Sequence, residues 1–243
     1  MSPVERRPLY VGLAALAAIV VAAIVIAVVI TGTDRDAGHV ASAPRDGRRS
    51  AVLDLVSGAG EVTVRSKDLG DQLYRISTPD GTGQVPRVDE RDGVATVRLD
   101  SVGGGGDGQA SVEILLSSAV TWTVRLDAGA SALRMDLRDG PVAGVEVTRG
   151  VSSAEVWLSR PPSLSERGTV PVRETGGAGT FAVHLPSGVP VRARLDGGAA
   201  SATVDGTTRS GLPGGAQLGS SDPSGGYDID AVGGVSTLRV DRF

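Results

Sequence analysis

The sequence predicts an all-β domain of stacked, parallel β-solenoid-like repeats of about 21 residues, preceded by one N-terminal transmembrane helix. Three observations support this fold class. Short runs that alternate apolar and polar residues, such as EVTVR and TWTVRLD, replace any long helical period. A glycine-centred pattern recurs six times from residue 51 onward, and an uncharged run of 22 residues lies near the N-terminus.

The uncharged run extends from Leu9 to Ile30 and predicts a membrane anchor. As a helix it would be about 33 Å long, which is enough to cross the hydrocarbon core of a bilayer. A cleaved secretory signal is the alternative, because ASA at 41–43 resembles a cleavage site. The apolar core of such a signal is only about 7–15 residues long, however, so we expect the anchor to be kept.

The charges beside the run predict its orientation. Arg6 and Arg7 precede it directly, which favours a cytoplasmic tail at 1–8 and a transmembrane helix at 9–30. The rest of the chain is then extracytoplasmic, and the protein is a single-pass protein of the cell membrane. Residues 31–50 are polar, contain glycine, proline and serine, and lack apolar periodicity, which predicts a flexible linker.

The composition excludes several kinds of site from the remaining domain at 51–243. The chain has 24 basic and 28 acidic residues, which gives no basic surface of the kind that binds nucleic acid. It has no cysteine, which excludes disulfides, thiolate metal sites and thiol nucleophiles.

The repeats become visible when one glycine in each is used as an anchor. The anchors are Gly58, Gly129, Gly150, Gly177, Gly198 and Gly234, and the second and third, like the fourth and fifth, lie 21 residues apart. The positions five before, four after and six after the anchor are apolar in all six repeats. The position four before the anchor is charged in every repeat and is occupied by Asp54, Arg125, Glu146, Arg173, Arg194 and Asp230.

Apolar positions two apart, beside a charged position, indicate strands with one face turned inward. Each repeat therefore reads as a strand, a tight corner of small residues and a second strand. A repeat of about 21 residues cannot bury its apolar face alone, so neighbouring repeats must stack. The matching inward positions favour a parallel stack, while a sandwich of antiparallel hairpins is the alternative that periodicity leaves open.

Residues 59–120 follow this register less well, and we expect them to form a distinct β-layer that caps one end of the stack. Within this segment, VDERDGVATVRLD predicts a hairpin that turns at Asp92-Gly93. The run GGGGDG at 103–108 predicts a flexible loop.

Several segments, including LDLVSGAGEVTV, WTVRLDAGASALRMDLRD and DAVGGVSTLRVDR, resemble a bacterial group of glycine-rich β-repeat domains. This group comprises the toast-rack and putative-adhesin domains and is similar to the C-terminal domain of Lia-type envelope-stress regulators. The resemblance covers about 51–243. It implies a stacked β-solenoid and a role at the cell envelope in stress sensing, regulation or adhesion, and it supplies no motif residues to transfer.

Three catalytic interpretations fail on the sequence. The glycine corners are followed by strands, whereas a phosphate cradle needs a following helix. The corner serines would need a histidine base, but His39 lies in the predicted linker and His184 has no carboxylate fixed near it locally. Asp228 and Asp230 fit a solvated strand face better than a calcium site. We therefore expect no enzyme activity, no cofactor and no metal.

Trp157 is the strongest candidate for a contact with a partner. It stands seven residues after its anchor and should point outward, and Asp136 and His184 occupy the same position in neighbouring repeats. An exposed tryptophan on a stacked β-surface makes these three residues candidates for a partner contact. The other interpretation, which the sequence favours, is that the loop RPPSLSERG at 160–168 covers Trp157. By contrast, Trp122 and Tyr227 share an inward position and should lie in the core.

These features predict a membrane-anchored, non-catalytic interaction or sensing module of the bacterial cell envelope, with envelope-stress regulation as one such role. The alternative is a structural or adhesive surface protein that has no signalling role. The expected partners are the lipid bilayer, through the N-terminal helix, and an envelope protein or cell-surface component.

Overall fold

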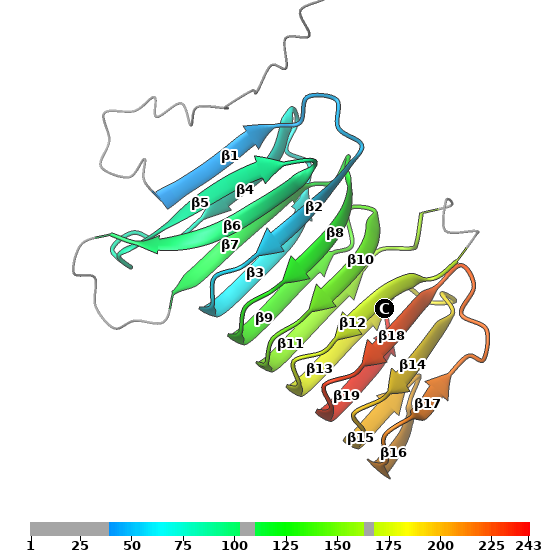
Figure 1. Cartoon of the computed structure of the whole chain (residues 1–243). Coiled ribbons are helices and arrows are strands. Elements are labelled where there is room, and N and C mark those ends of the chain that lie inside the picture. The colour runs from blue at the N-terminus through cyan, green and yellow to red at the C-terminus, as the bar shows by residue number, and fades with distance from the viewer. Residues whose placement is uncertain (1–38, 103–109, 163–167) are drawn as a thin grey trace, which may run out of the picture. The chain divides into compact units, whose positions relative to one another are not determined.

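A computed structural model describes residues 39–102, 110–162 and 168–243, and these residues form nineteen strands in two sheets and no α-helix (Figure 1). The ten-stranded sheet contains, in spatial order, β1 (Val40–Pro44), β4 (Gln72–Ser77), β7 (Ser111–Ser117), β3 (Ala59–Lys67), β9 (Ala130–Leu137), β11 (Val151–Leu158), β13 (Ala178–Leu185), β19 (Val235–Arg242), β15 (Ala199–Val204) and β16 (Thr207–Leu212). The nine-stranded sheet contains β17 (Ala216–Gly219), β14 (Val191–Leu195), β18 (Tyr227–Ala231), β12 (Val170–Glu174), β10 (Val142–Val147), β8 (Thr121–Leu126), β2 (Ser50–Leu55), β6 (Val94–Ser101) and β5 (Gln84–Arg91).

The six repeats stack in parallel. In each repeat the first strand belongs to the nine-stranded sheet and the second to the ten-stranded sheet, with the glycine corner between them. Equivalent positions pair across neighbouring strands, so that Leu133 lies beside Val62 on one side and Ala154 on the other. This register confirms the predicted parallel arrangement and excludes the sandwich of antiparallel hairpins for these repeats.

One apolar core fills the space between the two sheets. All eighteen apolar positions identified around the anchors are buried, with exposed fractions of 5% or less. Trp122 and Tyr227 lie in the core as predicted. Their polar atoms are satisfied there, because the Trp122 Nε1–H donates to the Ser117 carbonyl at 3.0 Å and the Tyr227 hydroxyl to the Ser159 carbonyl at 2.9 Å.

The glycine corners stack backbone upon backbone. A Cβ at Gly129 would lie 3.2 Å from the Gly150 carbonyl oxygen, which is closer than most side chains approach. The adjoining Ala130 N–H donates to that same carbonyl at 3.3 Å. The small residues at the corners therefore serve the close approach of successive repeats, in agreement with their structural interpretation.

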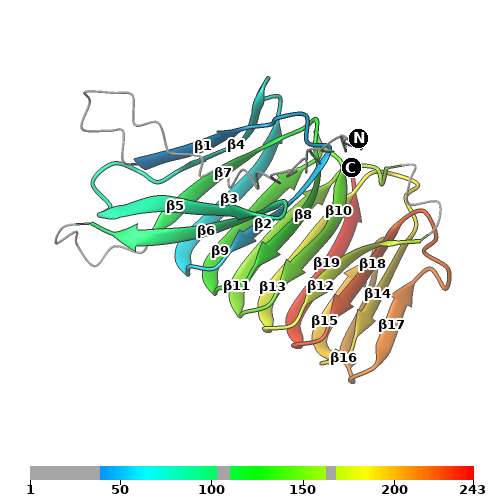
Figure 2. The same ribbon diagram turned by 45° about the horizontal axis from the view of Figure 1, so that its top comes forward.

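The repeats are not stacked in the order of the sequence. The repeat formed by β18 and β19 lies between β12–β13 and β14–β15, although it follows both along the chain (Figure 2). In this order the charged position alternates in sign along the nine-stranded sheet as Asp54, Arg125, Glu146, Arg173, Asp230 and Arg194. Stacking in sequence order would instead place Arg173 beside Arg194, and like charges directly opposite each other destabilise a sheet.

The two ends of the stack are built from antiparallel strands. The strands β1, β4 and β5 lie at one end and β16 and β17 at the other. The hairpin between β5 and β6 turns at Asp92-Gly93, whose φ angles of 51° and 80° confirm the predicted turn.

Two predicted boundaries are wrong. The flexible linker predicted at 31–50 contains strand β1, whose Ala43 is buried and which pairs with β4. The segment 59–120 does place β4, β5, β6 and β7 at one end of the stack, as predicted. It is not a distinct layer, however, because β3 lies inside the parallel stack beside β9 and the other strands extend the same two sheets. In both cases the strand is stabilised by a partner distant in sequence, which local patterning does not reveal. The loop predicted at 103–108 lies outside the described residues.

The predicted transmembrane helix at 9–30 also lies outside the described residues. Within the residues that are described, no helix is long and apolar enough to span a membrane.

Candidate interaction face

The three residues predicted to contact a partner lie in one row on the outer face of the ten-stranded sheet. Strand pairing sets Trp157 on β11 directly between Asp136 on β9 and His184 on β13. Each follows an inward residue of the core, namely Met135, Val156 and Val183, and therefore points away from it. The structure thus confirms their common position on the sheet.

The Trp157 side chain is held on two sides. The His184 ring, from β13, stacks on the indole with ring centroids 4.4 Å apart and planes inclined by 15°. The Arg134 guanidinium, from β9, lies 4.3 Å from the indole centroid. Since β9 and β13 flank β11, these groups approach from opposite sides, and the indole is half-buried with a fixed orientation.

Carboxylates fix both of these neighbours in turn. The Arg134 guanidinium donates to Glu155 Oε2 at 2.9 Å. The His184 Nδ1 is hydrogen-bonded to Asp241 on β19, and the other oxygen of that carboxylate accepts a bond of 2.7 Å from Arg239. We call Arg134, Trp157, His184 and Asp241 the Trp157 cluster.

Asp136 shares the row but not these contacts. Its carboxylate accepts two hydrogen bonds from Arg138, which directly follows the same strand, at 2.8 and 2.6 Å. The Arg138 bonds hold the pKa of this carboxyl below its usual value. Arg138 also lies 5.8 Å from the ring centroid of Phe243, which is 52% exposed. Asp136 therefore forms a second charged unit beside the Trp157 cluster.

Two residues of the Trp157 cluster, Arg134 and Asp241, were not predicted from the sequence, although the repeat pattern contains a signal for one of them. Asp241 stands seven residues after Gly234, in the same repeat position as Trp157 and His184, and could have been added to the row by counting. Arg134 and Glu155 share the position five after the anchor. That Arg134 leans over the indole depends on side-chain conformation, which repeat counting does not supply.

The Trp157 cluster presents aromatic and charged groups on the outer face of the sheet, and the indole is already in contact with His184 on one side and Arg134 on the other. A sugar ring that needs a free aromatic face would have to displace Arg134 or His184. The His184 Nε2 is buried and makes no hydrogen bond. The described residues contain no group of three or more side chains placed to hold a metal ion. The cover predicted from the 160–168 loop involves residues 163–167, which lie outside the described part of the chain.

No protein-family model matches the sequence, and no curated protein matches it either. Among solved structures, the chain is similar to a putative cell adhesion protein from Clostridium sporogenes, with a TM-score of 0.60 and 16% sequence identity over 84% of this chain and 98% of the other. A putative adhesin from Bacteroides fragilis gives a TM-score of 0.25 at 12% identity, over 83% of this chain and 96% of the other. The first of these shows that the chain shares its all-β fold with the Clostridium sporogenes protein.

Proposed function

We propose that the chain is a membrane-anchored, non-catalytic module that binds another component of the bacterial cell surface through the outer face of its ten-stranded sheet. The observation that carries this proposal is the Trp157 cluster. Its indole is fixed by His184 and Arg134, and each of these is fixed by a carboxylate. Tryptophan and arginine dominate the energetic centres of protein interfaces, and a pre-ordered side chain loses little entropy on binding.

An adhesive role is favoured over envelope-stress regulation. The structural neighbour with a TM-score of 0.60 is itself described as a putative cell adhesion protein, which agrees with a surface that binds without reacting. Regulation would require that the bound component be a membrane protein able to pass a signal across the bilayer. The identity of the component bound at Trp157 therefore separates the two roles.

The test is quantitative crosslinking in intact cells that express the full-length chain, followed by mass spectrometry. We expect Trp157→Ala to reduce recovery of the bound component by roughly 30-fold, which corresponds to about 2 kcal/mol for an interface centre. Leu218→Ala is the matched control. Leu218 is buried on β17, and its truncation costs about 2–5 kcal/mol of stability without touching the Trp157 cluster.

Recovery that falls with Trp157→Ala but not with Leu218→Ala supports binding at this face. Recovery unchanged by Trp157→Ala overturns the proposal. A recovered component exposed only at the cell surface supports adhesion, whereas a membrane protein with a cytoplasmic domain supports regulation instead.

A further inference from the structure

The repeat formed by β18 and β19, which we call the inserted repeat, occupies a slot between two repeats that precede it in the sequence. One wall of the slot is β12–β13 and the other is β14–β15. Both walls present the same inward positions, so the inserted repeat forms parallel ladders on each side. The whole slot is made by residues 170–205, and the inserted repeat is a separate, contiguous segment.

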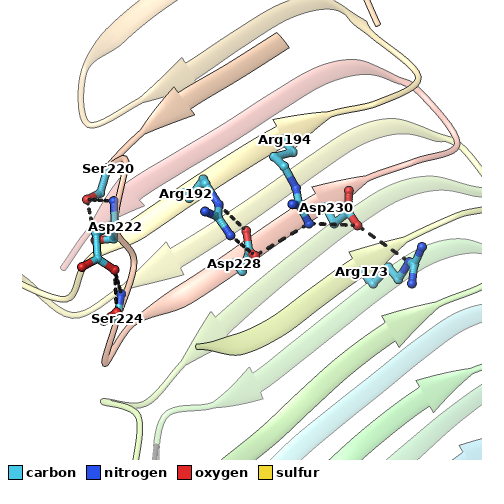
Figure 3. Close-up of polar contacts among 8 residues, drawn as sticks. All are labelled: Arg173, Arg192, Arg194, Ser220, Asp222, Ser224, Asp228 and Asp230. Atoms are coloured by element: carbon cyan, nitrogen blue, oxygen red, sulfur yellow. Dashed lines mark hydrogen bonds and ion pairs between the residues drawn. The ribbon is translucent and has the colours of Figure 1, made fainter. Parts of the chain in front are cut away.

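Basic side chains of the slot meet acidic side chains of the inserted repeat in the nine-stranded sheet (Figure 3). One acidic residue that follows β14, Asp196, also faces Asp230. Asp228 accepts two hydrogen bonds from Arg192, at 3.0 and 2.5 Å, and lies 3.7 Å from Arg194. Asp230 lies 3.6 Å from Arg194 on one wall and 3.9 Å from Arg173 on the other. The acidic side chains of β18 thus bind basic side chains of both walls.

The ten-stranded sheet repeats this pattern. Asp241 of β19 is hydrogen-bonded to His184 on one wall. Arg242 donates to both oxygens of Asp205, which follows β15 of the other wall, at 2.6 and 2.9 Å. Individual ion pairs at a surface contribute little stability, but a set of matched pairs selects one partner over others.

The charges also disfavour closure of an empty slot. If β12 paired directly with β14 in the same register, Arg173 would lie opposite Arg194. An acidic strand between them removes this repulsion. The slot therefore selects a segment with the charges of the inserted repeat, from whichever chain that segment comes.

The connection to the inserted repeat allows such a choice. Residues 220–226 join β17 to β18, and the side-chain bonds of this turn are local. Ser220 Oγ donates to the Asp222 carbonyl at 2.7 Å, and Asp222 Oδ1 accepts from the Ser224 N–H at 3.0 Å. The backbone also reaches the walls, because the Ser220 N–H donates to the Val191 carbonyl at 2.7 Å and the Gly225 N–H to the Gly168 carbonyl at 3.4 Å. The side-chain bonds are kept whichever chain supplies the slot, and the two backbone bonds can form to the equivalent carbonyls of a second copy.

From these observations we propose that the inserted repeat is an exchangeable docking element, which occupies the slot of a second copy of this chain as well as its own. Reciprocal exchange would join two copies through the same ladders and ion pairs that each forms alone, which is the low-cost route to a dimer known as domain swapping. This self-association does not require a partner at the Trp157 cluster, although Asp241 of that cluster lies on the inserted repeat.

The chain has no cysteine, so introduced cysteines report the exchange cleanly. Thr180 on β13, in one wall of the slot, pairs with Thr237 on β19 of the inserted repeat, and both residues are exposed. One full-length chain carries Thr180→Cys, a second carries Thr237→Cys, and the two are co-expressed and oxidised in detergent micelles with oxidised glutathione. Ala132→Cys and Ser153→Cys form the matched control, because these exposed residues pair across β9 and β11, which are not exchanged.

We expect the Thr180 and Thr237 chains to form an interchain disulfide several-fold more often than the control chains, whose yield measures random collision. Both cysteine pairs should form intrachain disulfides when placed in one chain. An interchain yield no higher than that of the control overturns the proposal. So does failure of the Thr180–Thr237 pair within one chain, because the slot would then not be occupied as described.

A charge reversal strengthens the test. Arg192→Asp is added to the Thr180→Cys chain and Asp228→Arg to the Thr237→Cys chain, so that each inserted repeat is repelled by its own slot and matched by the slot of the other chain. We expect the interchain yield to rise. A chain that carries both reversals together should regain the opposite-charge pair between positions 192 and 228 within its own slot, with Arg194 as a like charge nearby. If the doubly reversed control chain folds and the interchain disulfide yield of the reversed pair still does not rise, the slot does not recognise the inserted repeat by charge.

Discussion

Glu174 is an acidic residue at a position where the other five repeats have an apolar one. It lies three residues before its anchor, where the equivalents are Leu55, Leu126, Val147, Leu195 and Ala231, and it is fully buried. Its Oε1 accepts a hydrogen bond from the Gly177 N–H, and the N–H groups of Gly176 and Gly233 also face the carboxyl. Its Oε2 is buried without a hydrogen-bond partner. Burial raises the pKa of Glu174 above 4.5, although the N–H groups oppose this effect.

This raised pKa has a defined consequence for stability. The neutral carboxyl suits the buried site, so its contribution to stability is fully present below about pH 4.5 and is lost as the pH rises through the higher pKa of the folded state. We therefore expect the free energy of unfolding of the parent to fall, relative to that of Glu174→Gln, as the pH increases above 4.5. Urea unfolding of both chains at several pH values measures this difference. A constant difference across the range would contradict the burial of an ionisable carboxyl here.

At the scale of the strand and its corner, backbone contact decides which residues are allowed. A Cβ at Gly176 would lie 2.1 Å from the Arg149 carbonyl carbon and 2.5 Å from the Gly150 nitrogen, both of which belong to the neighbouring repeat. A backbone atom cannot move aside as a flexible side chain can. Gly176 therefore sets how closely the repeats stack at this corner.

We expect Gly176→Ala to destabilise the domain by roughly 2–3 kcal/mol, which is the upper part of the usual range for forced overpacking. Gly168→Ala is the control, because a Cβ there would meet no atom within 4 Å, and it should change stability by less than about 0.5 kcal/mol. Thermal or urea unfolding of the two variants provides the comparison. Equal effects would show that the corner tolerates a side chain and that its glycines are not required for close approach.

Sequence periodicity predicted the features that depend on local alternation. The inward positions, such as Leu133 and Met135, follow from a period of two, and the parallel stack follows from their recurrence. The order of the repeats could not be read in this way, because the pairing of β18 with β12 and β14 joins segments that are distant in the sequence. Repeat counting predicts Trp157 and His184 as neighbours, because they occupy the same position in adjacent repeats. It does not predict that the Arg134 guanidinium packs on the indole, because that contact depends on side-chain conformation.

At the scale of the whole molecule, the fold separates the two regions for which we propose different roles. The outer face of the ten-stranded sheet carries the Trp157 cluster, whose groups are fixed by bonds among themselves. The slot around β18 and β19 lies across both sheets and is specified by charge. Asp241 belongs to both the Trp157 cluster and the inserted repeat, because it lies on β19 and is hydrogen-bonded to His184. Exchange of that repeat would therefore leave the cluster complete, with one carboxylate supplied by the second copy.

The proposed role at the cell surface requires that the chain be held at the membrane. The uncharged run at 9–30 predicts such an anchor. We expect the full-length protein to stay with the membrane fraction through an alkaline carbonate wash, because a buried run of 22 uncharged residues contributes favourably along most of its length. Deletion of 9–30 should move the protein to the soluble fraction, and replacement by an unrelated apolar helix of equal length should restore retention.

Orientation is measured in the same cells. Protease added outside intact spheroplasts should digest the β-repeat domain, because Arg6 and Arg7 predict a tail on the cytoplasmic side. Retention of the deletion variant in the membrane would contradict the anchor. Digestion that occurs only after lysis would contradict the orientation, and the Trp157 cluster would then face the cytoplasm, where it could not act as an adhesive surface.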